Sequence, residues 1–193
     1  MATIESSILL AGIGGQGVLF AHQLLADCAV AQGLNVTGAE THGMSQRGGA
    51  VVSHLKIGDG AAPLIRQGTA DWLLAFDAAE AYRNLAFIRR GGTIVANSAL
   101  TDFPNAQVSQ QLENFGVVLH VLDADGIVRN LGRASAANVA LLGFAAGCAG
   151  FPLSRDMLRE TLVRVTRPQF VELNLQAFDE GARARSWKLE VRS

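Results

Sequence analysis

The stretch that most constrains the fold runs from Ser7 to Gly17, where a short apolar run leads into closely spaced glycines. Residues 8–10 are Ile-Leu-Leu, which is typical of a strand buried on both faces of a parallel sheet. Helical spacing of apolar residues begins directly after the glycines. A strand, a glycine turn and a helix in this order point the N–H groups of the helix toward an anion. The stretch therefore predicts the first β–α unit of a doubly wound α/β domain.

The glycine turn supplies the candidate cofactor-binding residues. Gly12, Gly14 and Gly17 stand at the G-x-G-x-x-G spacing, with Gly15 as an extra glycine and Gln16 as a polar residue between them. Without Cβ atoms, such positions let the backbone approach a nucleotide or a neighbouring element closely. The same turn also opens domains that bind no dinucleotide, where it only packs the first helix on the sheet. From the glycines alone, both interpretations stay open.

A second glycine-flanked segment, 41–49, carries more polar chemistry per residue than any other part of the chain. Loops held by a rigid sheet are where binding groups concentrate, so we predict a substrate or interface loop rather than a catalytic one. Its candidate residues are His42, Ser45, Gln46, Arg47, Gly48 and Gly49. The alternative is a surface loop in which Arg47 pairs with Glu40 or with nothing. Glu40 also lies about twenty residues beyond the glycine turn, where dinucleotide-binding domains often place a ribose-binding acid.

Apolar periodicity and turn residues predict alternating helices and strands in the rest of the chain. We expect helices at 18–32, 78–90, 138–149 and 154–165 and another from Pro168, and strands at 34–39, 50–57, 71–76, 93–96 and 117–122. The mixed polarity of 50–57 indicates an edge strand or one with a wet face. The whole pattern predicts one domain, residues 1–193, with a single Rossmann-like three-layer α/β fold, a mostly parallel central sheet and C-terminal helices.

Two polar groups follow predicted strands. Asn97 and Ser98 stand at the carboxyl end of one strand, where open α/β sheets bind ligands. Asp123 and Asp125 follow another, and two acids in one loop make a turn more often than a calcium site. No metal ligand and no catalytic residue is therefore assigned.

Composition excludes several classes of protein. A net charge of -1 with scattered basic residues argues against nucleic acid as a partner. The two cysteines form no Cys-x-x-Cys pair, so this chain alone cannot be expected to hold an iron–sulfur cluster or a structural zinc. The first residues carry no basic region, and no apolar run is long enough to span a bilayer. We expect a cytoplasmic protein with no membrane contact.

Several of these pieces occur together in one known family. The motif from Gly12 to Gly17, the segment from Glu40 to Gly49 and His54 resemble the gamma component of 2-oxoacid:ferredoxin oxidoreductases. The His-Gly-Met-Ser-Gln-Arg-Gly-Gly motif is most similar to that of the small (beta) subunit of indolepyruvate ferredoxin oxidoreductase. Near the C-terminus, Asn138 and Asn174, with the Leu-Gly and Ala-Phe pairs that follow them, are similar to the family's last helices. The resemblance covers nearly the whole chain.

The resemblance implies a subunit that is not active alone. In such enzymes thiamine diphosphate with magnesium acts on the 2-oxoacid, 4Fe-4S clusters pass electrons to ferredoxin, and coenzyme A takes up the acyl group. This chain shows no thiamine motif and too few cysteines, so these groups are expected on a larger partner subunit, with coenzyme A as a group that this chain could contact. Two alternatives remain: a stand-alone NAD(P)- or flavin-binding oxidoreductase, and a purely structural assembly module.

Overall fold

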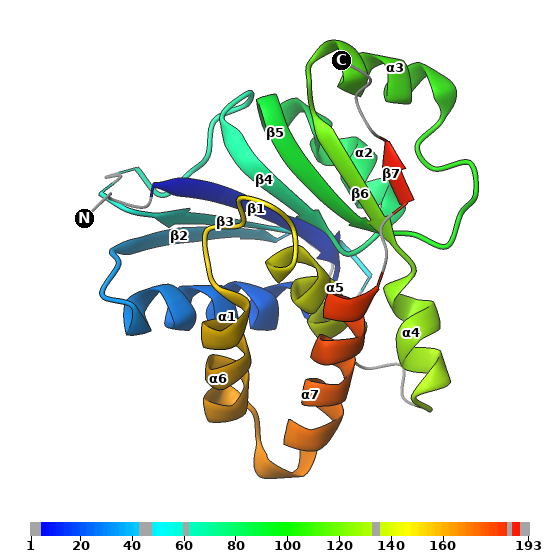
Figure 1. Ribbon diagram of the computed structural model, residues 1–193. Coiled ribbons are helices and arrows are strands. Elements are labelled where there is room, and N and C mark those ends of the chain that lie inside the picture. Colours follow the sequence, from blue (N-terminus) through cyan, green and yellow to red (C-terminus); the bar gives the residue numbers. More distant parts are fainter. Residues whose placement is uncertain (1–4, 43–47, 60–61, 133–135, 185–186, 190–193) are drawn as a thin grey trace.

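A computed structural model describes residues 5–42, 48–59, 62–132, 136–184 and 187–189, with His42 and 187–189 described by their backbone (Figure 1). Ser45, Gln46 and Arg47 lie outside the described residues, so the predictions made for them stay predictions.

A seven-stranded sheet forms the centre of the described structure, in the order β2-β3-β1-β4-β5-β6-β7. The four adjacent strands β1, β4, β5 and β6 are parallel, whereas β3 is antiparallel to β1 and β2, and β7 is antiparallel to β6. The strands span Ser6–Ile13 (β1), Val36–His42 (β2), Ala50–Ile57 (β3), Ala70–Ala75 (β4), Ile88–Asn97 (β5), Val118–Leu122 (β6) and Trp187–Leu189 (β7).

Helices cover both faces of the sheet (Figure 1). On one face lie α1 (Val18–Ala31), α4 (Ala124–Asn130), α5 (Ala137–Ala146), α6 (Arg155–Val165) and α7 (Pro168–Arg183). On the other lie α2 (Ala78–Asn84), the 3-10 turn η1 (Leu85–Phe87) and α3 (Ala106–Asn114). The predicted fold class, a three-layer α/β domain with C-terminal helices, is confirmed.

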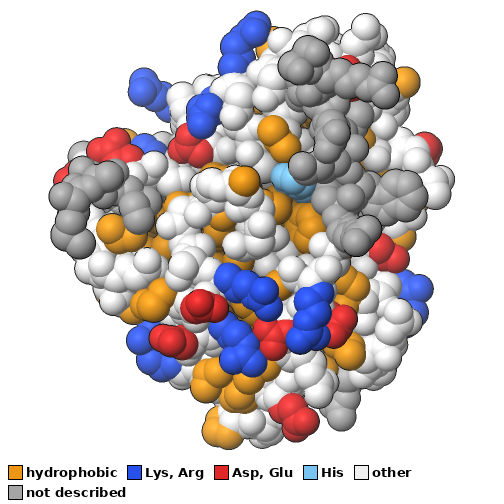
Figure 2. Space-filling view, in the orientation of Figure 1, with side chains coloured by type: hydrophobic (Ala, Val, Ile, Leu, Met, Phe, Trp, Pro, Cys, Tyr) orange, Lys and Arg blue, Asp and Glu red, His pale blue; other side chains and the backbone are white. Residues whose placement is uncertain are grey.

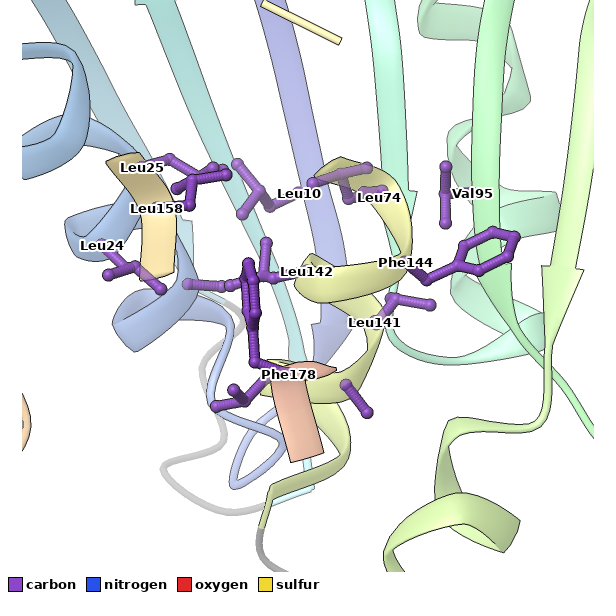
Figure 3. Close-up of a cluster of buried hydrophobic side chains, with 14 of the residues drawn as sticks. Leu10, Leu24, Leu25, Leu74, Val95, Leu141, Leu142, Phe144, Leu158 and Phe178 are labelled. Carbon is purple, nitrogen blue, oxygen red and sulfur yellow. The ribbon is translucent and has the colours of Figure 1, made fainter. Parts of the chain in front are cut away.

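The apolar run of β1 is continuous because both faces of this strand are buried. Ile8 and Leu10 face the core beneath α1 and α5, while Leu9 faces the smaller core beneath α2. Figure 3 shows Leu10 and Leu74 of the sheet beside helical leucines and Phe178 of α7. Burying a leucine or phenylalanine side chain in this way contributes about 1.5–3 kcal/mol each.

Two glycines set the crossing of α5 and α7. A Cβ atom built on Gly143 would lie 2.0 Å from the carbonyl oxygen of Phe178, and one built on Gly181 would lie 1.9 Å from the carbonyl oxygen of Ala140. Each helix thus presents a glycine to the backbone of the other. At the start of α5, Asn138 Nδ2 donates to the carbonyl of Gly17 in the glycine turn at 3.3 Å.

The predicted helix over 78–90 is too long. The structure ends α2 at Asn84, whose side chain donates to the carbonyl of Glu80 at 2.9 Å, and β5 begins at Ile88. Arg89 and Arg90 therefore lie on a strand and not in the last turn of a helix. The Arg89 Nε–Asp71 Oδ1 ion pair of 2.6 Å joins β5 to β4, a non-local contact that periodicity does not reveal.

The interpretation of 50–57 as an edge strand is wrong, because β3 lies between β2 and β1. Two of its polar residues are buried with partners: Ser53 is hydrogen-bonded to His22 and His54 to Ile65. Asp123 begins α4 as its N-cap instead of forming an isolated turn, since its side chain accepts from Gly126 N at 2.7 Å.

Charged side chains of both signs gather over α6 and α7 (Figure 2). Asp179 pairs with Arg159 at 3.1 Å and with Arg155 at 3.6 Å. Basic and acidic side chains are therefore mixed on this surface, as the scattered charges of the sequence predict.

Candidate functional site

The glycine turn lies where the chain divides between the two faces of the sheet. After β1 the chain passes to α1 on one face, and after the adjacent parallel strand β4 it passes to α2 on the other. In open α/β sheets this division opens a crevice at the carboxyl ends of the strands, which is the usual place for a ligand. The predicted cofactor-binding residues therefore stand at the crevice.

The turn is held by its own side chain and by close packing. Gln16 Oε1 accepts from Ile13 N at 2.8 Å, and Gln16 N donates to the carbonyl of Ile13 at 3.0 Å. A Cβ atom on Gly12 would come within 2.7 Å of Val18 and 3.1 Å of Phe76. Gly15 and Gly17 have φ angles of 105° and 76°, a region that favours glycine. The side-chain oxygen of Gln16 thus shapes the turn.

The structure brings the two glycine motifs together. Gly14 N donates to the carbonyl of Gly49 at 2.9 Å, and β1 and β3 pair Ile13 with Ala50. Gly48, with a φ of 79°, and Gly49 therefore lie beside the glycine turn. The backbone of His42 ends β2 at the same edge, since β2 is parallel to β1 through the two antiparallel pairings. The polar loop predicted for binding starts and ends at the crevice.

A recess of about 170 Å³ opens at the turn. It is lined by Gly15, Gln16, Phe76, Asn97, Asp125, Ala137 and Asn138. Asn97, predicted from its place at a strand end, is its centre: Nδ2 donates to Asp125 Oδ2 at 2.8 Å and to the carbonyl of Phe76 at 3.2 Å, and Oδ1 accepts from Ala124 N at 2.9 Å.

Sequence reasoning missed Asp125 and Asn138 as site residues. Asp125 was interpreted as part of a turn, yet it faces the recess from α4. Asn138 comes from α5, more than a hundred residues beyond the turn, and donates Nδ2 to the carbonyl of Gly17 at 3.3 Å. The position of Asp125 just after a predicted strand was an available signal, whereas nothing local to Asn138 indicates the contact.

The recess can bind a ligand with two kinds of group. The first N–H groups of α1 have no partner within the helix, Gly17 caps the helix without a side-chain hydrogen bond, and the first turn carries no acid. This end favours an anion. Asp125 and Asn97, which also line the recess, suit a hydroxyl or amide group. Among the described residues there is no group of three or more His, Cys, Asp or Glu side chains that could hold a metal.

Glu40 does not occupy the place of a ribose-binding acid. It lies exposed on β2, which β3 separates from β1, so it is two strands from the glycine turn. Its negative charge instead acts on His22, whose pKa is lowered by burial and partly restored by Glu40. His22 Nδ1 lies 2.6 Å from Ser53 Oγ.

His54 lies within the structure and away from the recess. It is 4% exposed, its Nδ1 accepts from Ile65 N at 3.2 Å, and its ring meets Phe87 edge-on. Burial lowers the pKa of His54, so the neutral ring is favoured. The histidine that forms part of the family motif is thus a packing residue here.

Comparison with known proteins decides the family. A family model described as pyruvate ferredoxin/flavodoxin oxidoreductase matches residues 7–184. The chain belongs to this family. It is a subunit of the 2-oxoacid:ferredoxin oxidoreductase type, as the sequence predicted. The indolepyruvate oxidoreductase subunit IorB of Thermococcus kodakarensis is 32% identical in an alignment of 195 positions, and the alignment covers 93% of this chain and 96% of that protein.

Solved structures of the family share the fold. The gamma subunit of keto/oxoacid ferredoxin oxidoreductase from Geobacter sulfurreducens matches with a TM-score of 0.73 and 26% identity, covering 92% of this chain and 96% of that one. A 2-oxoglutarate:ferredoxin oxidoreductase from Magnetococcus marinus, solved with 2-oxoglutarate, coenzyme A and succinyl-CoA bound, matches with a TM-score of 0.74 and 23% identity, covering 92% of this chain and 30% of that one. Among the described residues, no helix has the length and apolar character needed to cross a membrane.

Proposed function

We propose that this chain is the small subunit of an indolepyruvate:ferredoxin oxidoreductase. The observation that carries the proposal is the 32% identity to an indolepyruvate oxidoreductase subunit over nearly the full length of both chains. The reaction would be the oxidative decarboxylation of an aryl 2-oxoacid to an acyl-CoA, with two electrons passing to ferredoxin.

The redox and thiamine chemistry would reside on a larger partner subunit. A 4Fe-4S cluster needs four thiolates, and this chain has two cysteines, of which Cys28 is buried in α1. Burial raises the pKa of the Cys28 thiol, which disfavours the thiolate that a metal requires. When bound on the partner, thiamine diphosphate with magnesium would supply decarboxylation and the clusters would supply electron transfer.

This chain would contribute the coenzyme A end of the site. The uncapped N-terminus of α1 and the open backbone at Gly15 and Gly17 suit a phosphate group of coenzyme A. The structural neighbour from Magnetococcus marinus, whose fold this chain shares, was solved with coenzyme A bound. The Asn97–Asp125 pair would then orient a hydroxyl or amide of the same ligand. The loop with His42, Ser45, Gln46 and Arg47 would contact the substrate or the partner subunit.

The subunit assignment is tested by activity. The chain should show no indolepyruvate-dependent reduction of a viologen dye by itself, and full activity after co-expression with its larger partner. Indolepyruvate should be preferred over pyruvate and 2-oxoglutarate. Full activity of this chain alone would refute the assignment, and a preference for pyruvate would refute the substrate.

The coenzyme A contact is tested by one charge at the N-terminus of α1. Leu19 is 41% exposed in the first turn, so Leu19→Asp and Leu19→Asn differ in charge and little else. An aspartate in the first turn interacts favourably with the helix dipole, and asparagine matches it in size, so a difference between the two variants reports the added charge. In the assembled complex, Leu19→Asp should raise KM for coenzyme A about three- to tenfold at unchanged KM for indolepyruvate, whereas Leu19→Asn should not. Equal KM values for coenzyme A in the two variants would show that no phosphate of coenzyme A binds at this turn.

A further inference from the structure

A second and larger recess lies next to the glycine turn, between α1, α5 and the start of α7. Its volume is about 450 Å³, within the range of small-molecule sites. Asn138 lines both recesses. The proposed function makes no use of this larger recess.

Aromatic and aliphatic side chains make up most of its surface. Phe20 of α1 and Phe170 of α7 supply two rings, and Val139, Val165 and Leu173 supply aliphatic surface between them. Phe170 is 41% exposed, so a large apolar side chain faces water at the mouth of a concavity. A flat apolar ligand that stacked against these rings would remove that surface from water.

Fixed polar groups lie among the apolar ones. Asn174 Nδ2 donates to Thr166 Oγ1 at 3.3 Å, and Asn138 Nδ2 donates to the carbonyl of Gly17 at 3.3 Å. Each carboxamide is thereby oriented and keeps further donor and acceptor capacity for a ligand. Few, oriented polar groups in an apolar pocket are typical of specific small-molecule binding.

The charge of the recess has one sign. Arg167 stands at its rim as the N-cap residue of α7, and no ion pair joins it to another described residue. The described residues that line the recess include no aspartate or glutamate. A guanidinium beside aromatic rings favours a carboxylate or phosphate attached to a ring.

We propose that this recess is a second binding site, for a planar aromatic molecule that carries an anionic group. The ring lies between Phe20 and Phe170, the carboxamides of Asn138 and Asn174 contact polar atoms of the ring, and the anionic group pairs with Arg167. Two sources share this chemistry: an aryl carboxylate and a purine nucleotide.

The test uses the full chain and two anionic probes, indole-3-acetate and AMP, each beside its neutral counterpart, indole and adenosine. Backbone amide spectra are recorded during titration to about 10 mM, a range that includes millimolar ligands. We expect at least one anionic probe to shift the resonances of Val139, Val165 and Asn174. The probe that binds more tightly identifies the source.

Two exposed substitutions separate the ring contact from the charge contact. Phe170→Ala should weaken both the anionic probe and its neutral counterpart about fivefold or more. Arg167→Gln should weaken the anionic probe about threefold or more and leave the neutral one unchanged. Phe115→Ala, which removes a similarly exposed ring elsewhere, is the matched control and should change neither. If Phe170→Ala failed to fold, Arg167→Gln would still test whether the anionic group binds in this recess.

Three results would overturn the proposal: no shifts with any probe, shifts confined to other residues, or binding that neither Phe170→Ala nor Arg167→Gln changes. If the chain binds no probe and the same variants fail to assemble with the larger subunit, the recess is a contact surface for a protein partner instead. Because these measurements need no turnover, their failure is distinct from a failure of the oxidoreductase assignment.

Discussion

The crossing of α5 and α7 makes Gly143 a severe test of the packing argument. Gly143→Ala adds a Cβ atom 2.0 Å from the carbonyl oxygen of Phe178, whereas carbon and oxygen atoms normally approach to about 3.3 Å. The two backbones must therefore separate by about 1.3 Å, the difference between these distances. Phe178 is fully buried, so this separation loosens the core around it.

The expected cost combines two opposing contributions. A forced separation of this size costs about 3 kcal/mol or more, at the upper end of the range for overpacking, because it also loses dispersion contacts. Alanine regains about 1 kcal/mol of helix propensity over glycine. The free energy of unfolding should thus fall by about 2 kcal/mol or more, measured by urea denaturation followed by far-UV circular dichroism.

Gly147→Ala is the matched control, because it follows the same helix in a right-handed conformation and its nearest neighbour atom is 3.3 Å away. It should change the free energy of unfolding by less than about 0.5 kcal/mol. Gly181→Ala should cost as much as Gly143→Ala, and the double variant should cost less than the sum, since one separation relieves both clashes. A Gly143→Ala variant as stable as the parent protein would refute the reasoning.

Further predictions concern the recess and two titrating groups. Asn97→Ala should lower the free energy of unfolding by about 2–4 kcal/mol in urea denaturation, because it removes three hydrogen bonds and leaves buried partners unsatisfied. Burial holds the pKa of His54 below 6.5, so the unfolded chain takes up a proton that the folded chain refuses, and stability should fall as pH drops below 6.5; His54→Gln should reduce that slope. Burial raises the pKa of Asp71, but hydrogen bonds from Arg89 and Ser7 lower it by more, so its stabilisation is present above pH 3.8 and is lost as the pH falls further. Because the Arg89–Asp71 pair is partly exposed, Arg89→Gln should lower the free energy of unfolding by about 1 kcal/mol or less. The loss should be smaller still at about 1 M salt, where the Debye length of about 3 Å screens the pair.

Each of these predictions has an outcome that contradicts it. An Asn97→Ala variant with parental stability would mean that the amide does not hold the strand ends. The pH dependence of stability is compared between about pH 5.5 and 6.5, the range of about one unit below the ordinary histidine pKa. If His54→Gln leaves this dependence unchanged, another group is responsible for it. A cost for Arg89→Gln that does not change with salt would show packing rather than charge at that pair.

The sequence by itself determined the elements that depend on neighbouring residues. The strand, glycine turn and helix from Ser6 to Ala31 follow from an apolar run, residues that tolerate positive φ and helical spacing, all within one segment. Ser154 caps α6 and Pro168 begins α7 for equally local reasons, since a hydroxyl satisfies a free N–H and proline lacks one. The end of a strand likewise indicated Asn97.

The tertiary structure decided what depends on residues far apart in the chain. Periodicity cannot show that β3 inserts between β1 and β2, or that the strand predicted at 93–96 begins as early as Ile88, because strand pairing is a choice of partners rather than a local preference. The contact of Asn138 with Gly17 joins residues more than a hundred positions apart, and the close packing of α5 on α7 at Gly143 and Gly181 is equally non-local. Short sequence motifs thus indicated the polar groups of the site, whereas tertiary packing determined which residues line it.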